Sequence, residues 1–426
     1  MRIFQHPVFQ KFSTSYAKGT ISLFAGLSLS RVILALGGLV LARWYGAEHF
    51  AVYSVFLSLA MILPVIGNLR LEQMLLLLQP RSDIRNLFSF TFLISTLIIS
   101  VITLGMWVIQ KVGFQVSNLN TGWLFLSGVG AIFFAWNLNQ QAVLVKLSKY
   151  KYMAAAYLVG AVVTIAAQIL FYMLDNQEGG LIYGWILGVV ATAIFLAFFT
   201  AKEIKIPQIP AVKSILNAQR RILYFTLPSD IIHTVANNIL PILLIMFFPK
   251  QEVGVFALAY KILTTPLFLI TSSVSQVFLR KAAELKDQKP WMLHRLTMRL
   301  TLYATAVMAL FVLLANTIGL YFLLWFYDSE WNSLALFIPI LSVLIVARSV
   351  SAVILPVTLV INKNHYALYF NCTLLLINLL AIYLGYIYSS FTIALAAFSL
   401  LSALAYLVLM ISVKSSLNRY SHRVAA

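Results

Sequence analysis

The strongest constraint on this chain is a series of long apolar runs that carry almost no ionised side chains. About 20 apolar residues cross the hydrocarbon core of a bilayer as a helix, and a helix satisfies its backbone polar groups within the segment. The last two runs share one stretch without charge, which we divide at residues 388–390. We predict twelve spans, at residues 19–42, 49–69, 86–109, 121–143, 152–174, 179–200, 222–248, 253–278, 298–320, 333–357, 366–387 and 391–412.

The composition excludes an ordinary soluble domain. Hydrophobic residues make up 62% of the chain and charged residues only 10%, whereas soluble domains carry about 25% charged residues. The surplus apolar surface has to face lipid. The sequence therefore predicts an all-α polytopic membrane protein with about twelve transmembrane helices.

The formal net charge of +18 follows from topology and needs no nucleic acid partner. With a cytoplasmic N-terminus, the predicted spans place 24 of the 30 Lys and Arg residues on the inside. Only Arg43, Lys111 and Lys250 fall in outside loops. Because cytoplasmic loops collect Lys and Arg, we expect both termini to be cytoplasmic.

The chain divides into two halves of six spans each. Residues 202–221 contain two prolines and form the predicted cytoplasmic linker between an N-terminal lobe, 1–201, and a C-terminal lobe, 222–426. Two pairs of segments resemble each other in the same order, 41–53 with 246–256 and 144–152 with 359–366. Parallel six-helix repeats imply a pseudo-two-fold axis along the membrane normal, a plan of secondary transporters with the site between the lobes.

Four charged residues lie well inside predicted spans: Arg31, Lys261, Arg348 and Asp230. An intramembrane charge costs at least about 2.5 kcal/mol and marks a candidate functional site. Arg31 is roughly 18 Å deep at the rise of a helix, close to the midplane. Three cations against one acid imply an anionic substrate, and the planar fork of arginine suits phosphate. We therefore predict that Arg31, Lys261 and Arg348 bind substrate.

Each of these residues also has a structural interpretation. Lys261 can extend its stem outward so that its ammonium reaches water. Asp230 can neutralise Arg31, Lys261 or Arg348 in a buried pair, and Arg31 or Arg348 can serve the fold alone. The charge balance favours substrate binding without excluding these alternatives.

The seventh predicted span carries a polar stripe of Asp230, His233 or Thr234, and Asn237. Their spacing of three to four residues places them on one helix face. One interpretation is hydrogen bonding between helices. The other is a cavity wall, with Asn237 lining it and Asp230 and His233 as candidates for ion coupling, since both can carry protons.

Catalytic and metal-binding motifs are missing from the sequence. It has no phosphate-binding G-x-x-x-x-G-K-[ST] segment and no zinc-binding H-E-x-x-H segment. Its one cysteine, Cys372, excludes an intramolecular disulfide. We expect no enzymatic activity, no catalytic residue, no metal and no cofactor.

An ordered series of segments resembles the O-antigen-type (Wzx-type) polysaccharide flippases of the multidrug/oligosaccharidyl-lipid/polysaccharide exporter superfamily. The likeness covers roughly residues 18–380; the departure at Ala51, where the family commonly has glycine, hardly affects it. The segments that carry it are residues 41–53, 69–73, 79–83, 140–150, 228–241, 254–260, 275–284 and 330–331.

The resemblance implies two six-helix lobes around a central cationic cavity, lined by the first, seventh and eighth spans. It also implies a cargo of polyprenyl-pyrophosphate-linked oligosaccharide, the repeat unit of an O-antigen, lipopolysaccharide, capsule or similar polymer. This cargo would be flipped from the inner to the outer leaflet of the bacterial inner membrane by alternating access, coupled to an ion gradient. Expected partners are this lipid-linked oligosaccharide, membrane lipid and other polysaccharide-assembly proteins.

Two alternatives remain open. A drug or cation exporter of the same superfamily would be expected to carry carboxylates in its cavity, where this chain has an excess of cations. A polysaccharide polymerase or ligase would be expected to carry a sizeable periplasmic loop, which the predicted topology lacks.

Overall fold

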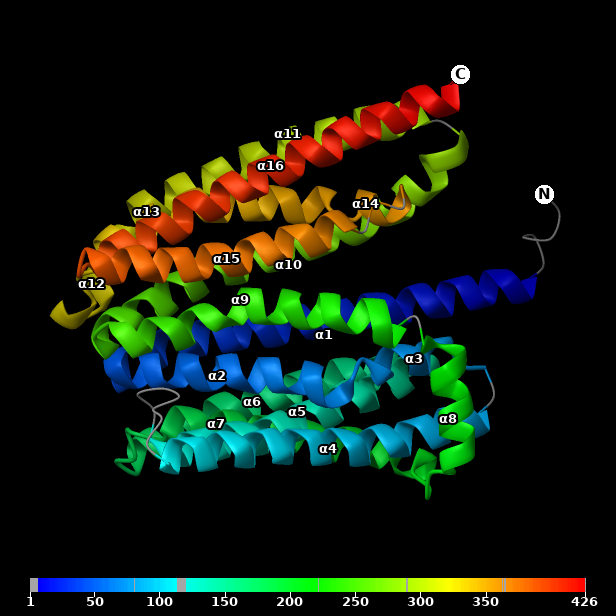
Figure 1. Ribbon diagram of the computed structural model, residues 1–426, viewed down its shortest axis with the longest axis horizontal. Coiled ribbons are helices and arrows are strands. Elements are labelled where there is room, and N and C mark those ends of the chain that lie inside the picture. Colours follow the sequence, from blue (N-terminus) through cyan, green and yellow to red (C-terminus); the bar gives the residue numbers. More distant parts are fainter. Residues whose placement is uncertain are drawn as a thin grey trace. The chain divides into compact units, whose positions relative to one another are not determined.

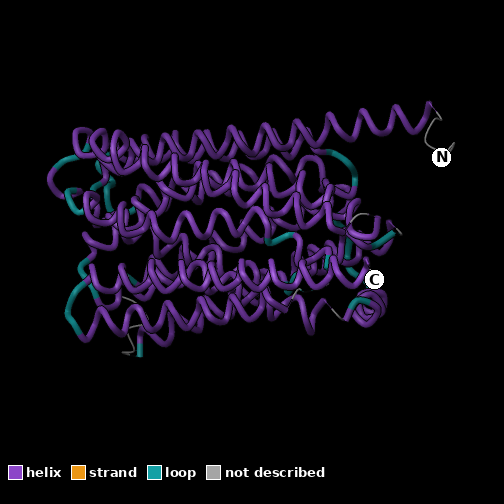
Figure 2. Tube along the Cα trace, turned by 90° about the horizontal axis from the view of Figure 1, so that it is seen from above, coloured by secondary structure: helices purple, strands orange, loops and turns teal. Residues whose placement is uncertain are grey.

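The computed structural model describes residues 7–79, 81–112, 120–220, 222–288, 290–361, 363 and 365–425. Within these ranges the chain consists of helices joined by short turns, without a strand (Figure 2). Eleven of the helices found there are long and apolar enough to cross a membrane. The predicted all-α multi-span class is therefore confirmed. The first six residues, which we predict to be cytoplasmic, lie outside the described part.

The chain divides into two compact units. Unit 1 comprises Met1–Tyr45 and Val52–Thr234, and unit 2 comprises Gly46–Ala51 and Val235–Ala426. Two helices pass from one unit to the other, because α2 (Ala47–Asn68) begins in unit 2 and α9 (Leu227–Phe247) begins in unit 1. The helices are labelled in Figure 1.

In unit 1, α1 packs against α6, α6 against α7, and α5 against both α4 and α7. The spans predicted at 19–42, 86–109 and 121–143 fall within α1, α4 and α5, and those at 152–174 and 179–200 match α6 and α7 except for one residue each. The elements up to the second crossing helix are α1 (Pro7–Tyr45), α2 (Ala47–Asn68), α3 (Leu71–Leu77), α4 (Arg81–Lys111), α5 (Thr121–Lys146), α6 (Tyr150–Met173), α7 (Gly180–Thr200), η2 (Ala201–Glu203), α8 (Ile209–Ala218), η3 (Ile222–Thr226) and α9 (Leu227–Phe247).

Buried amides join these helices where apolar packing alone gives little specificity. Asn137 and Gln140 of α5 donate to the carbonyls of Val189 (3.0 Å) and Ala193 (3.2 Å) on α7. Asn139 of α5 donates to the Oδ1 atom of Asn68 (3.2 Å) at the end of α2. Polar side chains in membrane bundles bond across helices in this way, and here they fix the register of α2, α5 and α7.

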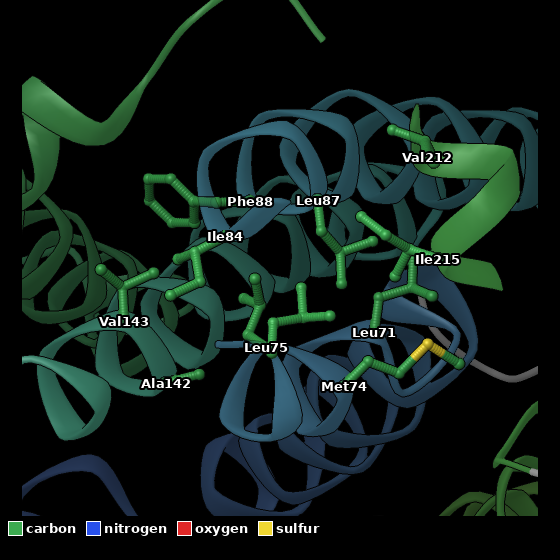
Figure 3. Packing of buried hydrophobic residues seen from close by; sticks show 11 residues of the cluster. Leu71, Met74, Leu75, Ile84, Leu87, Phe88, Ala142, Val143, Val212 and Ile215 are labelled. Atoms are coloured by element: carbon green, nitrogen blue, oxygen red, sulfur yellow. The ribbon is translucent and has the colours of Figure 1, made fainter. Parts of the chain in front are cut away.

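An apolar cluster fixes the short helices α3 and α8 to the ends of α4 and α5. Figure 3 shows its side chains pointing toward one another from these four helices. Leu75 of α3 and Leu87 of α4 are completely buried, and Val212 of α8 is 2% exposed. The predicted linker 202–221 thus contains a folded helix that packs on unit 1. The cluster is Leu71, Met74, Leu75, Leu78, Ile84, Leu87, Phe88, Ala142, Val143, Val212 and Ile215.

In unit 2, α13 packs against α10, α11 and α16, and α15 packs against α16. The predicted break at residues 388–390 is confirmed, since α15 ends at Ile387 and α16 begins at Phe391. The elements are α10 (Lys250–Gln288), α11 (Pro290–Leu314), η4 (Ala315–Gly319), α12 (Leu320–Phe326), η5 (Ser329–Trp331), α13 (Leu334–Ile354), α14 (Val357–Val360), α15 (His365–Ile387) and α16 (Phe391–Ala425).

The turn between α1 and α2 is a single residue, Gly46, with a φ of +79°. Only glycine adopts this backbone conformation without a steric cost. The residues that follow it pack into unit 2, where Gly254 of α10 approaches the backbone of Ala47. A Cβ atom at Gly254 would lie 1.8 Å from the Ala47 carbonyl oxygen, so no larger residue fits this contact as it stands.

Candidate anion-binding groups in the spanning helices

Arg348 lies in α13, within a spanning helix of unit 2 that ends at Ile354. Its Nη1 donates to the Tyr260 hydroxyl of α10, and its Nη2 donates to Asn237 Oδ1 of α9 at 3.2 Å. The guanidinium also lies 5.7 Å from the Tyr260 ring centroid, within the range of a cation–π contact. The structure thus brings together two predicted site residues, Arg348 and Asn237. All of these partners are neutral, so they orient the guanidinium without cancelling its charge.

Lys261 follows Tyr260 in α10, and its ammonium lies 5.5 Å from the ring centroid of Phe50. Phe50 is 3% exposed and packs edge-on against Trp331, with ring centroids 6.3 Å apart. The lysine is half-buried. Its contact is therefore the face of a buried aromatic ring that packs against a second aromatic ring.

Two positive charges lie at adjacent residues of α10. Lys261 belongs to this helix, and Arg348 of α13 contacts the preceding residue, Tyr260. Among the ion pairs formed within the described ranges, none includes either residue. A cation removed from water without a carboxylate partner retains a strong attraction for anions. For a group such as phosphate, the guanidinium of arginine offers a planar pair of donors.

Arg31 lies in α1 and belongs to unit 1. It is half-buried and interacts electrostatically with Tyr157 of α6. Tyr157 in turn donates to Gln141 Oε1 of α5 at 2.7 Å. The third predicted substrate-binding cation is thus positioned by the packing of α1 on α6.

Asp230 lies in the first turn of α9 and pairs with Arg70, not with one of the three intramembrane cations that the structural interpretation named. Its Oδ2 atom lies 2.7 Å from Nε of Arg70, in the turn between α2 and α3. Arg70 Nη1 also bonds Glu72 Oε1 at 3.2 Å. Both side chains of the Arg70–Asp230 pair are largely shielded, at 21% and 25% exposed.

Glu72 completes this group as a mostly buried acid. Burial raises the pKa of Glu72 above its ordinary value, the Arg70 guanidinium partly offsets this, and the Asp230 carboxylate adds to the rise. Two acids around one arginine leave no excess of positive charge. The group is therefore an ion-pair cluster that joins the start of α9 to the α2–α3 turn.

The polar stripe of α9 divides among different environments. Asp230 bonds Arg70, Asn237 bonds Arg348, and His233 between them is exposed. Among the described residues, no group of three or more His, Cys, Asp or Glu side chains is arranged to hold a metal ion.

Sequence reasoning missed Arg70 and Tyr260 as parts of these clusters. The sequence pattern places Arg70 in a cytoplasmic loop and gives no partner for it. In the structure its φ is +58°, and this left-handed turn determines where the Arg70 side chain points. Both residues lie in segments that carry the family resemblance, 69–73 and 254–260, which is the available signal.

Comparison with known proteins adds a family and a fold. A family model described as "Polysaccharide biosynthesis protein" matches residues 40–336. This range contains Asp230, His233, Asn237 and Lys261, whereas Arg31 and Arg348 lie outside it. A search of curated proteins found no match.

Several solved structures have a similar fold. The lipid II flippase MurJ, in an inward closed conformation, has a TM-score of 0.70 at 14% identity, over 96% of this chain and 90% of MurJ. A multidrug resistance MATE family transporter of the MOP superfamily, facing inward, has a TM-score of 0.61 at 16% identity, over 97% and 95%. A mutant of the Vibrio cholerae MATE transporter VcmN has a TM-score of 0.58 at 14% identity, over 95% and 98%. At these identities the likeness establishes the fold.

Proposed function

From the premise that the chain belongs to the polysaccharide biosynthesis protein family, we propose that it is a flippase for polyprenyl-pyrophosphate-linked oligosaccharide. The cargo would be a repeat unit of an O-antigen, capsule or similar polymer, and it would move from the inner to the outer leaflet of a bacterial inner membrane. Both termini would lie in the cytoplasm. The chain would consist of two six-helix lobes, 1–201 and 222–426, joined by the linker.

The observation that carries this proposal is a pair of cations in unit 2. One is Lys261 of α10, and the other is Arg348, which bonds the neighbouring residue Tyr260. Arg348 is held by Tyr260 and Asn237, Lys261 faces the ring of Phe50, and none of these contacts is a carboxylate. A pyrophosphate supplies the missing negative charge, and its oxygens match the two-pronged geometry of a guanidinium. In this proposal Arg348 and Lys261 bind the pyrophosphate of the lipid.

Arg31 would contribute a further cation from unit 1. Its described contacts include Tyr157 and, through it, Gln141, whose polar groups can orient a guanidinium. We propose that Arg31 binds the pyrophosphate or an acidic sugar. The proposed roles of Arg31, Lys261 and Arg348 rest on their positive charge and on their hydrogen-bond donors.

Transport by alternating access would be coupled to an ion gradient through α9. Solved MATE transporters with this fold have been described in inward-facing and outward-facing conformations. Asp230 and His233 are our candidates for coupling, because the Arg70–Asp230 pair breaks if the carboxylate takes up a proton and His233 is exposed to exchange protons. Asn237 would keep Arg348 directed during the cycle.

A drug exporter is the alternative that the fold allows, since MATE transporters share it. A cationic drug would meet repulsion from Lys261 and Arg348. The charge at this position therefore favours an anionic cargo.

The sidedness of the lipid-linked intermediate tests the function. After depletion of the protein, we expect the oligosaccharide lipid to accumulate in the inner leaflet, where an impermeant enzyme or lectin added outside cannot reach it. Outward-facing lipid at its normal level would refute the flippase proposal.

The role of Arg31 is tested by comparing Arg31→Ala with Arg31→Lys in the same assay. We expect alanine to abolish most transport and lysine, which retains the charge, to restore part of it. Lys111→Ala provides a matched control, because this exposed cation lies at the end of α4. Full transport by Arg31→Ala would remove Arg31 from the site.

A further inference from the structure

The segment between α7 and α9 is fastened to α4 by polar contacts. Glu203 of η2 accepts bonds from Arg81 and Arg85, with Arg85 Nε at 2.7 Å. Farther along, the backbone N–H of Lys205 donates to Ser89 Oγ at 2.9 Å, and that of Gln208 donates to Asn86 Oδ1 at 3.2 Å. The chain from 203 to 208 is therefore held in a defined path along α4.

The helix α8 then runs across the end of α4, whereas the spanning helices of unit 1 run along one another (Figure 1). In the turned view of Figure 2, a helix at the same end is seen along its axis. Val212 and Ile215 anchor α8 in the apolar cluster. A short helix that lies crosswise to spanning helices is parallel to the membrane plane, which is the orientation of helices that bind at the level of the lipid headgroups.

Three isoleucines of this segment are exposed. Ile204 is 53% exposed, Ile206 is 90% exposed and Ile209 is 61% exposed. The first two share one side of an extended stretch, because side chains alternate along extended backbone. Removing each of them from water is favourable, so a surface of this kind is expected to be covered.

Cations are interleaved with these isoleucines. Lys202 precedes Ile204, Lys205 separates Ile204 from Ile206, and Lys213 lies one turn after Ile209 on α8. Lys202 and Lys213 are exposed. Apolar side chains flanked by lysines, at the ends of spanning helices, match the boundary between acyl chains and anionic headgroups.

We propose that Ile204, Ile206, Ile209, Lys202 and Lys213, together called the linker surface, bind the membrane interface. The isoleucines insert at the boundary of the acyl chains, and the two lysines bind the phosphate groups of anionic phospholipids. The occupant is the lipid of the leaflet in which this end of α4 lies. The linker thereby ties unit 1 to the membrane surface, independently of which cargo the protein carries.

Depth measurements on spin-labelled protein in nanodiscs test the insertion. In a Cys372→Ala background, Ile206→Cys, Ile209→Cys and Ser214→Cys are labelled, the last as an exposed position of the same region. We expect labels at 206 and 209 to collide with dissolved oxygen more than with an aqueous nickel chelate, and the label at 214 to show the reverse. Equal aqueous access at all three positions would overturn the proposal.

The charge contribution is tested with a matched pair of double variants. Lys202→Gln with Lys213→Gln removes two cations from the linker surface, and Lys151→Gln with Lys414→Gln removes two exposed cations elsewhere. Retention of phosphatidylglycerol over phosphatidylcholine is measured by native mass spectrometry. We expect a roughly thirty-fold weaker preference in the first variant, from the attraction of two lysines to an anionic surface, and little change in the second.

Equal losses in both double variants would contradict a specific surface. Protection of position 206 only after a second copy of the chain or another protein is added would assign the surface to a protein partner and overturn the lipid proposal. Either result leaves the flippase proposal intact, because its assay follows the cargo.

Discussion

Two arginines bond the same helix, α9, two turns apart, and their surroundings differ in charge. Arg70 bonds Asp230 and also Glu72, so two carboxylates surround one guanidinium. Arg348 bonds Asn237 and Tyr260, which are neutral. The difference in charge arises because the partner on α9 is a carboxylate at Asp230 and a neutral amide at Asn237.

The comparison separates an arginine that holds the fold from one that can bind a ligand. Breaking a shielded ion pair leaves an uncompensated charge and weakens the structure. An arginine with neutral partners keeps its position and its charge, which an anion can use. We therefore expect changes at Arg348 to affect transport first, and changes at Arg70 to affect stability first.

The largest effect is expected for Arg348→Gln. Removal of the guanidinium should reduce transport roughly ten- to a hundred-fold, since hydrogen bonds to a charged group contribute about 1.5–3 kcal/mol. Arg348→Lys should recover part of the rate, because lysine restores the charge without the fork. The measurement is the initial rate of lipid translocation in reconstituted vesicles, and an unchanged rate for a folded Arg348→Gln protein would contradict the comparison.

The next effect concerns the coupling of Arg70 and Asp230. In a double-mutant cycle with Arg70→Gln and Asp230→Asn, we expect a coupling free energy of about 1–2 kcal/mol, between the values of exposed and fully buried pairs. Chemical unfolding in mixed micelles measures it. If the two changes are simply additive, the pair does not stabilise the fold.

A smaller effect is expected for Tyr260→Phe. This change keeps the aromatic ring and removes the hydroxyl that accepts from Arg348, a loss of about 1 kcal/mol or roughly five-fold in transport. Tyr383→Phe, on the exposed side of α15, is the control. A loss as large as that of Arg348→Gln would show that Tyr260 has a role beyond orienting the arginine.

The smallest effect is the pH dependence that Glu72 confers. Burial raises the pKa of Glu72 above its ordinary value of 4.5, so the folded state keeps this proton to higher pH than the unfolded state. The contribution of Glu72 to stability should therefore fall as the pH rises from 4.5 through the raised pKa. Unfolding curves of Glu72→Gln should lack this decrease, and identical curves for both proteins would exclude it.

The spans could be predicted because their cause is local. A run of apolar residues crosses a membrane whatever its neighbours are, and the break at residues 388–390 follows from the same short-range pattern. The excess of cations over acids was also visible, and Lys261 and Arg348 lie within long helices without a carboxylate partner among the described ion pairs.

The partners of these charges could not be predicted, because they come from distant segments. Asp230 is 160 residues from Arg70 in sequence, and the left-handed turn at Leu69 and Arg70 decides where that guanidinium points. The linker posed the same difficulty. Its composition indicates a connector, and only the contacts of Lys205, Gln208 and Val212 show that it is fixed to α4 and the cluster around it.

The sequence by itself determined the membrane class, the long helices, and the presence of three cations and one acid inside them. These follow from hydrophobicity and helical rise, which act within a segment. Tertiary structure decided which charges are cancelled and which are not, since a charge is neutralised only by a group within a few ångströms. That proximity made an ion pair of Arg70 and Asp230 and left Arg348 with an amide and a phenol.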